Sequence, residues 1–444
     1  MKSSALPPPT VAPDDNGAAI LLLTRLFPSP RPFDIRLWDG SVIHGDGDAA
    51  FTLVIASAAA LRDMFRPPVE ASLGDAFLAG DLEIEGDICA AFPIVDACRR
   101  AVRSPARLLE LARLWWRLPA ENSANGNGRA PAPLTGGLHT PDRDRAAVRY
   151  HYDLGNDFFA LFLDRRMVYS AGYFLEANED LDSAQARKLD HICRKLRLEQ
   201  GERLLDVGCG WGALLIHAAR EYGIRGTGIT LSEQQHVLAR ERVAEAGLGD
   251  RIEVRLLDYR DLREETWDKV SSVGMFEHVG RERLPEYFAR IFGVLRPGGL
   301  FLNHGISERW SLYHPTLRSR LLDPLNRIVV GKSPLTRSVF PDTELIPLSE
   351  VNSLAEAAGW EVRDIENLRE HYALTLRRWV ERLEEREEAA VRLVGTPTFR
   401  AWRLYFALAA NRFERAQTSV NQTLLAKLDG GRAGVPLSRA DIYA

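Results

Sequence analysis

Leu204-Leu-Asp-Val-Gly-Cys-Gly-Trp-Gly212 is the stretch of sequence that decides the fold. Its apolar run ends at Asp206, a glycine-rich turn follows, and residues 213–220 then have helical character. Glycines lack a Cβ atom, so the backbone of this turn can adopt positive φ angles and approach a ligand closely. The glycines concerned are Gly208, Gly210 and Gly212. A strand, a tight loop and a helix in this order predict a ligand-binding loop at the carboxyl end of a strand in an open α/β sheet.

Further strand–helix units follow the glycine loop. Residues 226–232 and 252–258 predict a second and a third strand, and residues 270–273 and 300–306 predict a fourth and a fifth. The carboxyl ends of parallel strands lie along one edge of their sheet. The spacing therefore suits a nucleoside-bearing cofactor laid across consecutive strand ends.

The bulk composition limits the classes of function. The chain has 444 residues, enough for two domains, and 45% hydrophobic residues, enough for a core. A net charge of −4 gives no global basic field that would point to nucleic acid. The four cysteines show no paired metal spacing, and without a secretory leader we expect reduced thiols in a cytoplasmic protein. The longest apolar run, near residues 49–61, is too short to span a bilayer.

Composition divides the chain into four segments. Residues 1–18, rich in Pro, Ser and small polar residues, predict a disordered tail. Residues 19–100 predict a small α+β module, in which Asp39-Gly40 is a hairpin signal. Residues 101–141 predict a basic helix followed by a flexible linker, and residues 142–444 form the second domain.

The basic helix is expected over residues 101–118, where arginines surround leucines and a Trp115-Trp116 pair. A helix of this composition can lie at an anionic lipid surface. A helix packed on its own protein with solvated arginines fits the same pattern. The sequence leaves both interpretations open.

Two aromatic and polar stretches, residues 149–159 and 167–174, precede the first strand of the predicted sheet. They fit a lid over the cofactor site, and they also fit a buried seam between helices. Glu277 and His278 follow the carboxyl end of the fourth strand, and His304 lies near the end of the fifth. A carboxylate and imidazoles at the rim that holds the glycine loop are groups for acid–base chemistry.

Two helices are predicted near the C-terminus. Residues 379–394 carry many glutamates and arginines, which is typical of a solvated helix face. Residues 399–428 predict a helix with aromatic side chains along one side. That helix either closes a substrate channel or packs on the domain.

These motifs together resemble the cyclopropane-fatty-acyl-phospholipid synthases and the mycolic acid methyltransferases, which are class I S-adenosylmethionine-dependent enzymes. The resemblance extends from about Leu73 to the C-terminus. It implies an α/β, doubly wound, mostly parallel seven-stranded methyltransferase sheet after a small α+β domain. The matching blocks are His151–Asp157, Tyr169-Ser170, Leu205–Gly212, Thr230–Gln235, Gly274–Gly280, His304–Ile306 and Tyr372, with Leu73–Gly80 in the N-terminal module.

The resemblance implies a site for S-adenosylmethionine. Tyr169, Ser170 and the glycine loop would hold the methionine part, and an aromatic face can stabilise the sulfonium by about 0.5–2 kcal/mol. Thr230 and Gln235 match positions that hold the ribose, and Tyr259 matches an adenine-stacking position. Asp206 closes the first strand, where an acid can fix the amides of the loop. The implied cofactor-binding residues are Tyr169, Ser170, Asp206, Gly208, Gly210, Gly212, Thr230, Gln235 and Tyr259.

The resemblance also implies the chemistry. Methyl transfer to an isolated cis alkene leaves a carbocation, which must lose a proton from the new methyl group before a ring closes. In the family a bound bicarbonate takes that proton, and here the implied catalytic positions are Glu277, His304, Tyr372 and the amides of Ala171 and Ile306. A carboxylate beside bicarbonate would repel it, so either Glu277 is protonated or His304 is charged.

The sequence departs from the family pattern at two usual cysteine positions, which hold Ala171 and Ala409. The outcome of the reaction is therefore open between a cyclopropane and a methyl- or methylene-branched chain. Methylation of a small polar molecule and lipid binding without catalysis are the competing functions. The leading hypothesis is a peripheral enzyme at the inner membrane surface, with unsaturated acyl chains of the phospholipid bilayer as substrate. For its assembly, a homodimer and a monomer both stay open.

Overall fold

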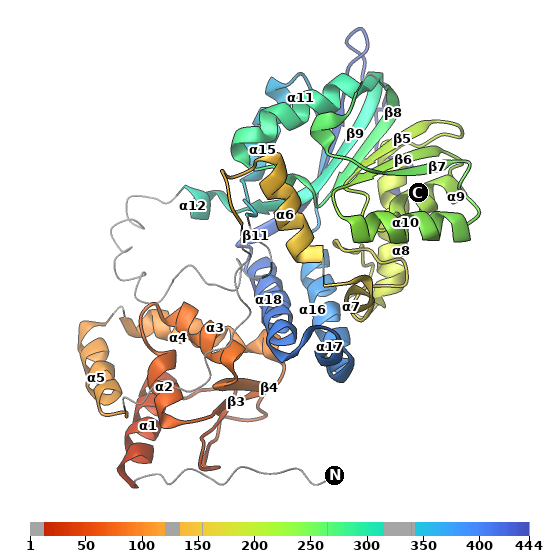
Figure 1. Ribbon diagram of the computed structural model, residues 1–444. Coiled ribbons are helices and arrows are strands. Elements are labelled where there is room, and N and C mark those ends of the chain that lie inside the picture. Colours follow the sequence, from red (N-terminus) through yellow and green to blue (C-terminus); the bar gives the residue numbers. More distant parts are fainter. Residues whose placement is uncertain are drawn as a thin grey trace. The chain divides into compact units, whose positions relative to one another are not determined.

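The computed structural model describes residues 13–102, 104–119, 134–152, 154–263, 265–314, 339 and 342–443. The chain forms two compact units, which Figure 1 shows and which we describe separately. The first unit contains the described residues up to 119, Val339 and Gly395–Leu408, and the second contains the remaining described segments. The predicted linker, residues 121–133, and most of a long insertion after residue 313 lie outside the described residues.

The first unit is an α+β module around a four-stranded sheet with the order β2-β1-β3-β4. Strand β1 pairs antiparallel with β2 and parallel with β3, and β3 pairs antiparallel with β4. The predicted Asp39-Gly40 turn joins β1 to β2, with Gly40 at φ 85°. The elements are α1 (Pro13–Leu26), β1 (Asp34–Arg36), β2 (Val42–Ile43), β3 (Phe51–Ile55), α2 (Ala58–Met64), α3 (Val69–Ala79), β4 (Leu82–Gly86), η1 (Ile88–Ala91), α4 (Pro93–Val102) and α5 (Pro105–Trp116).

Two predicted boundaries in this unit are wrong. Helix α1 begins at Pro13, so residues 13–18 are helical and not part of a disordered tail. The helix packs on the first unit through a row of buried apolar residues at helical spacing. The residues of that row are Ala19, Leu22, Leu23 and Leu26. The basic helix starts at Pro105 and not at residue 101, since Ser104 caps its first turn by accepting a hydrogen bond from the Arg107 amide.

The second unit contains the predicted doubly wound sheet of seven strands, in the order β10-β11-β9-β8-β5-β6-β7 (Figure 1). Strand β11 is antiparallel to both of its neighbours, and the remaining pairs are parallel. The strands are β5 (Arg203–Val207), β6 (Arg225–Thr230), β7 (Ile252–Leu256), β8 (Trp267–Val273), β9 (Leu295–Glu308), β10 (Glu361–Asn367) and β11 (Thr418–Ala426).

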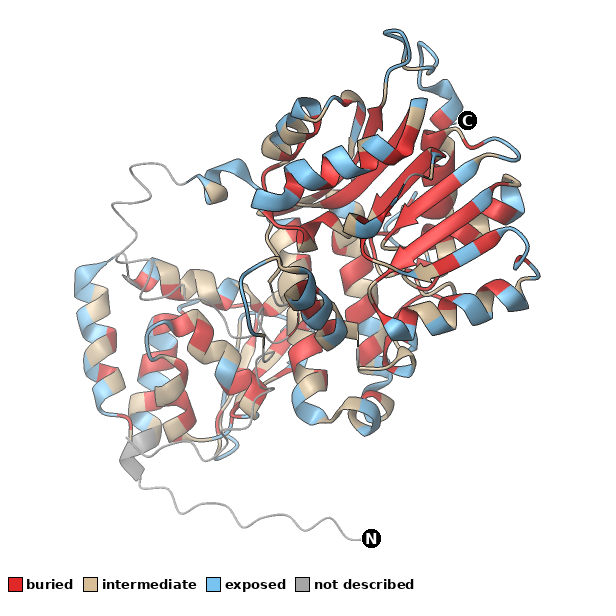
Figure 2. Ribbon diagram, turned by 45° about the horizontal axis from the view of Figure 1, so that its top comes forward, coloured by how far each residue is buried: buried red, intermediate tan, exposed pale blue. Residues whose placement is uncertain are grey.

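Helices cover this sheet on both faces, and Figure 2 shows the buried strands between them. Adjacent residues of a strand point to opposite faces, so Leu204 belongs to one core cluster and Leu205 to the other. The main helices are α6 (Pro141–Tyr152), α7 (Asn156–Ala160), α8 (Leu181–Leu196), α9 (Ala213–Glu221), α10 (Glu233–Glu245), α11 (Leu284–Val294), α15 (Leu348–Ala357), α16 (Arg369–Glu385) and α17 (Glu387–Val394). Shorter turns are η2 (Tyr259–Asp261), η3 (Phe276–His278), η4 (Arg281–Arg283), α12 (Trp310–Tyr313) and α19 (Ala440–Tyr443). None of the helices in the described part of the chain is both long and apolar enough to cross a membrane.

The C-terminal region differs most from its prediction. The predicted helix over residues 399–428 is α18 (Thr396–Glu414) followed by strand β11, because the chain reverses at Ala416, whose φ is 50°. Strand β11 fills the place between β9 and β10 and is buried along almost its whole length. The predicted charged helix is likewise two helices, α16 and α17, that meet at Arg386.

Candidate active site

The glycine loop follows β5 as predicted, and its three glycines have φ angles of 81°, 54° and 80°. The amides of Gly208 and Cys209 both donate to the Ile229 carbonyl of β6, at 3.0 Å each. The prediction that Asp206 fixes these amides is therefore wrong. Its Oδ1 instead accepts a hydrogen bond from the Ser271 hydroxyl of β8 at 2.7 Å. The loop is held by the neighbouring strand, which leaves the Asp206 carboxylate to the cavity.

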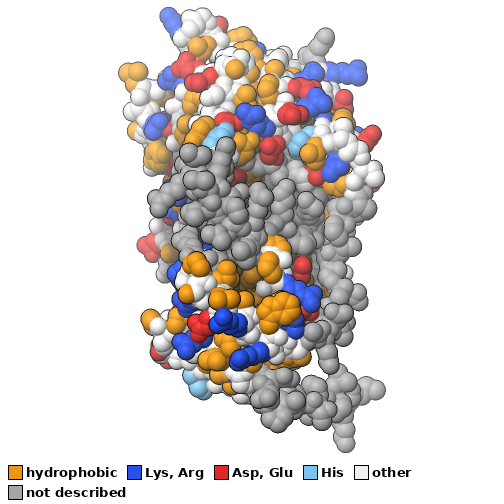
Figure 3. All heavy atoms as spheres, turned by 90° about the vertical axis from the view of Figure 1, so that its left-hand side faces the viewer, with side chains coloured by type: hydrophobic (Ala, Val, Ile, Leu, Met, Phe, Trp, Pro, Cys, Tyr) orange, Lys and Arg blue, Asp and Glu red, His pale blue; other side chains and the backbone are white. Residues whose placement is uncertain are grey.

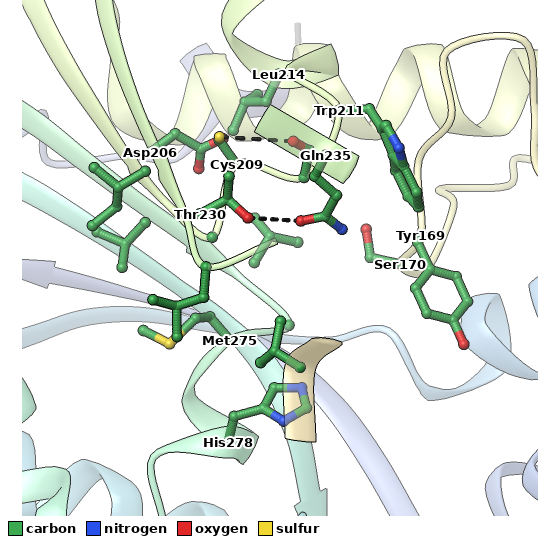
Figure 4. Close-up of a pocket in the computed structure, with 18 of the residues that line it drawn as sticks. Tyr169, Ser170, Asp206, Cys209, Trp211, Leu214, Thr230, Gln235, Met275 and His278 are labelled. Atoms are coloured by element: carbon green, nitrogen blue, oxygen red, sulfur yellow. Dashed lines mark hydrogen bonds between the residues drawn. The ribbon is translucent and has the colours of Figure 1, made fainter. Parts of the chain in front are cut away.

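A cavity opens at the carboxyl ends of β5, β6, β7 and β8, and Figure 4 shows its labelled side chains around an open space. Eight of the nine predicted cofactor-binding residues line it. They are Tyr169, Ser170, Asp206, Gly208, Gly210, Thr230, Gln235 and Tyr259. The ninth, Gly212, is the N-cap residue of α9 and shapes the loop from outside the lining.

The walls of this cavity carry groups that suit a nucleoside. Thr230 donates its hydroxyl hydrogen to Gln235 Oε1 at 2.8 Å, which fixes both polar side chains at the cavity wall (Figure 4). The Ser232 hydroxyl caps α10 by accepting a hydrogen bond from the backbone amide of Gln235. Tyr259 is 8% exposed and its ring meets Tyr287 edge-on at 5.4 Å, so one wall is a fixed aromatic ring.

An aromatic cluster surrounds Tyr169 at the other side of the cavity. Its ring is stacked on His151 at 5.7 Å and tilted against Trp379 at 5.0 Å. Further rings join the cluster, namely Tyr152 and Phe159 of the first predicted aromatic stretch and Phe162 just after it. Tyr152 and Trp211 also line the cavity. These stretches thus contribute to a buried aromatic seam, as one of the two interpretations expects, and Tyr152 and Tyr169 of this seam also line the cavity.

Glu277 lies on η3, next to but outside the lining of the cavity, with 3% of its surface exposed. Its Oε1 accepts a hydrogen bond from the Ile306 amide of β9 at 2.7 Å. Its Oε2 is buried without a hydrogen-bond partner among the described residues. Burial raises the pKa of this carboxyl to about 7, so below that pH it holds a proton that Oε2 can donate. The Ile306 amide already donates its hydrogen bond to Glu277. It is therefore not available to bind an anion, contrary to the prediction.

His304 lies on β9, two residues before Ile306, and is 1% exposed. Its Nδ1 accepts a hydrogen bond from the side-chain amide of Gln422 on β11 at 3.2 Å. A neutral imidazole with an acceptor at Nδ1 carries its hydrogen on Nε2. That Nε2 is buried and has no partner in the described part of the chain. Burial lowers the pKa of His304 to about 3, so the ring is neutral.

The remaining predicted catalytic positions are Ala171 and Tyr372. Ala171 is fully buried between Ser170 and Gly172, and its amide donates to none of the described residues, while the next amide bonds the Thr375 hydroxyl at 2.9 Å. Tyr372 is half-buried on α16, where its ring packs against Phe413 at 4.7 Å and Trp379 at 6.0 Å. Trp379 connects Tyr372 to the cluster around Tyr169.

Four residues of this region were missed by sequence reasoning. Trp379 was assigned to a solvated helix, but it is 1% exposed because it faces the aromatic cluster. Gln422 was placed on a helix and is instead the strand residue that orients His304. Lys188 and Trp211 also line the cavity; no pattern in the sequence distinguished Lys188, and Trp211 lies in the quoted glycine-rich stretch but was given no role of its own.

The fold and the cavity define the class of the protein, which is an S-adenosylmethionine-dependent methyltransferase. The crystal structure of mycolic acid cyclopropane synthase CmaA1 complexed with S-adenosylhomocysteine and CTAB is 31% identical, with a TM-score of 0.57 over 63% of this chain and 97% of that chain.

The family follows from the sequence comparisons. The family model described as mycolic acid cyclopropane synthetase matches residues 139–423, and the chain belongs to this family of lipid-modifying methyltransferases. A Pseudomonas putida protein named "probable fatty acid methyltransferase" is 39% identical over 93% of this chain and 96% of its own length. A Mycobacterium tuberculosis protein of the same name is 36% identical over 90% of this chain and 92% of its own length.

Proposed function

We propose that the chain transfers the methyl group of S-adenosylmethionine to the cis double bond of an unsaturated phospholipid acyl chain and produces a cyclopropane. The observation that carries the proposal is the set of buried, unpartnered polar atoms beside the cofactor cavity. Glu277 Oε2 and His304 Nε2 both lack partners among the described residues, which is costly unless a ligand satisfies them.

The cavity suits the methyl donor. When bound, S-adenosylmethionine supplies an electrophilic methyl group on a sulfonium. Tyr169 and Tyr152 present aromatic rings at the cavity wall, which attract a cation by about 0.5–2 kcal/mol each. The same rings keep water out, and water would otherwise capture the carbocation formed on the substrate.

Bicarbonate fits the unpartnered atoms, and when bound it would supply the base that removes the proton. His304 offers an N–H at Nε2, protonated Glu277 offers an O–H at Oε2, and Ala171 offers an amide with no partner among the described residues. These donors would hold the anion, with Tyr372 as the remaining predicted position. Since a protonated Glu277 carries no charge, the repulsion expected from a carboxylate is absent.

A branched product is the second candidate. The carbocation gives a ring when the new methyl group loses the proton, and a methyl- or methylene-branched chain when the acyl chain loses it. Two observations favour the branched outcome. Ala171 stands where the family usually has cysteine, and two relatives that match at least 90% of the chain are named as probable fatty acid methyltransferases.

We also propose that the first unit binds the lipid surface through α5. This helix buries Leu111 and Leu114 in its own unit and exposes Leu109 and Trp116, the latter by 68%. Figure 3 shows apolar and basic side chains side by side on this face. Arginines next to an exposed tryptophan suit anionic headgroups over acyl chains. They include Arg113 and Arg117, which are both exposed.

The test incubates the purified full chain with methyl-labelled S-adenosylmethionine and phosphatidylglycerol vesicles. We expect label in lipid from vesicles with cis-unsaturated chains, none from saturated vesicles, and a lower rate after bicarbonate is removed. Label that stays out of the lipid, in a protein that binds S-adenosylhomocysteine, would contradict the proposal. Fragmentation of the labelled lipid then distinguishes a ring from a branch.

A further inference from the structure

Lys188 is a buried lysine of the second unit to which no role has been assigned so far. It lies on α8, is 1% exposed and lines the cofactor cavity. Its Nζ donates to the Ser170 hydroxyl at 2.9 Å. In the described part of the chain, no carboxylate oxygen lies within 4.0 Å of this Nζ. A buried ammonium whose only bonded partner is neutral has its charge uncompensated at close range.

Asp206 is the complementary group of the same cavity. It is 3% exposed, lines the cavity at the end of β5 and accepts a hydrogen bond from Ser271. It lies close enough to Lys188 to influence its ionisation, yet the two form no ion pair within 4.0 Å. The cavity wall therefore presents a separate positive and a separate negative group.

Asp164 is the other carboxylate near Lys188 and influences its ionisation more than Asp206 does, but it forms no ion pair with Lys188 within 4.0 Å and both of its oxygens already accept backbone hydrogen bonds. Its two oxygens accept hydrogen bonds from the amides of Val168 and Arg166, at 2.7 and 2.9 Å. It also does not line the cavity. Pairing with Asp164 thus does not explain why a lysine is buried at this position.

An α-amino acid group fits such a wall because it carries a carboxylate and an ammonium on one carbon. Charged groups buried in a protein are favourable when each meets an opposite charge with good hydrogen-bond geometry. A nucleoside without charged groups would leave the charges of both Lys188 and Asp206 without a partner of opposite sign. Ser170, which matches a position for the methionine part of the cofactor, is the residue that Lys188 holds.

We propose that Lys188 binds the carboxylate of the methyl donor's amino-acid end and that Asp206 binds its ammonium group. This inference rests on the proposed use of S-adenosylmethionine, and it names the two residues that distinguish this cofactor from an uncharged adenosine thioether. Lys188 also positions Ser170 through its hydrogen bond. Burial lowers the pKa of Lys188 to about 8 and raises that of Asp206 to about 6, and a bound amino-acid group would stabilise the charged form of both.

The test measures binding by calorimetry for two ligands, S-adenosylhomocysteine and 5′-methylthioadenosine, which lacks the amino-acid end. In Lys188→Met we expect the affinity for S-adenosylhomocysteine to fall roughly 10- to 100-fold and that for 5′-methylthioadenosine to stay within twofold. Lys269→Met is the matched control, because Lys269 is 7% exposed and lies outside the cavity lining. It should change neither affinity.

Equal losses for the two ligands would overturn the proposal, since they would mean that Lys188 only maintains the shape of the pocket. Unchanged binding of S-adenosylhomocysteine would also overturn it. If Lys188→Met does not fold, the unmodified protein still decides, because decarboxylated S-adenosylhomocysteine should then bind at least 10-fold more weakly than the intact ligand. A wild-type protein that binds none of these ligands would instead contradict the proposed function.

Discussion

Replacing Glu277 with glutamine should make the second unit more stable at alkaline pH while it removes most of the activity. The carboxyl is buried, one oxygen bonds the Ile306 amide, and the other has no partner among the described residues. Glutamine keeps the shape and the acceptor for the amide, but it cannot ionise. The variant therefore isolates the cost of placing a negative charge at this position.

The magnitude follows from the pKa of Glu277, which burial raises from 4.5 to about 7. A carboxyl whose pKa is raised on folding contributes full stability below its unfolded pKa and loses that contribution as pH rises through the folded value. The raised pKa corresponds to a loss of about 3 kcal/mol between pH 4.5 and pH 8. Wild type suffers this loss and Glu277→Gln does not.

Thermal melting in bicarbonate-free buffer at pH 5 and pH 8 measures the effect. We expect the variant to melt within about 3 °C of wild type at pH 5, where less than ~1 kcal/mol of the loss has occurred, and roughly 6–12 °C higher at pH 8, since ~1 kcal/mol moves the midpoint by roughly 2–4 °C in a unit of this size. Glu282→Gln is the control, because Glu282 is an exposed glutamate nearby and should give no such difference.

Activity of the same variant tests the chemical role. Methyl transfer should fall by about 10²–10⁴-fold, the range for removal of an acid–base group, while the affinity for S-adenosylhomocysteine stays within twofold. The reasoning is refuted if Glu277→Gln is less stable than wild type at pH 8. It is also refuted if turnover and cofactor affinity fall by the same factor, because Glu277 would then support the cofactor pocket.

Three further perturbations have defined outcomes. Gln422→Leu removes the donor to His304 Nδ1 and should lower methyl transfer about 10-fold in a radiolabel assay without changing S-adenosylhomocysteine binding. Replacing Trp115 and Trp116 together with alanine should weaken co-sedimentation with anionic vesicles, while activity on detergent-dispersed lipid is kept. Gly305→Ala places a Cβ 1.9 Å from a ring carbon of Phe276, so it should destabilise the second unit by at least about 1–3 kcal/mol in a melting experiment, and an unchanged midpoint would contradict the packing described at β9.

The sheet could be predicted because short stretches of sequence are enough to recognise most of its strands. Strand β5 is an apolar run that ends in a glycine loop, and the units after it repeat that pattern with helices between them. Buried parallel strands are apolar on both faces, which is why Leu204 and Leu205 both belong to cores. The same reasoning failed for β11, whose sequence Thr418-Ser-Val-Asn-Gln-Thr contains polar residues that are nevertheless buried.

Those polar residues become understandable only through partners that are distant in sequence. Asn421 donates to the Ser307 hydroxyl and Gln422 to His304, each more than 100 residues away along the chain. Lys188 is a similar case, since a lysine on a helix is usually solvated and its burial depends on the cavity that other segments build. Sequence patterns indicate which face of a helix or strand packs against the core. They do not indicate which buried polar groups form hydrogen bonds with one another.

Burial explains how the proposed bicarbonate site could hold an anion next to a glutamate. Taking a carboxyl and an imidazole out of water disfavours the charged form of each, so the pKa of Glu277 rises to about 7 while that of His304 falls to about 3. Between these values both groups are neutral, and each has a hydrogen to donate at an atom without a partner among the described residues. Of the two possibilities for avoiding repulsion, the structure therefore favours a protonated Glu277 over a charged His304. Above about pH 7 the ionised Glu277 would repel the anion, so its binding should weaken as pH rises through that value, and an affinity that increases with pH would show that Glu277 is not part of the anion site.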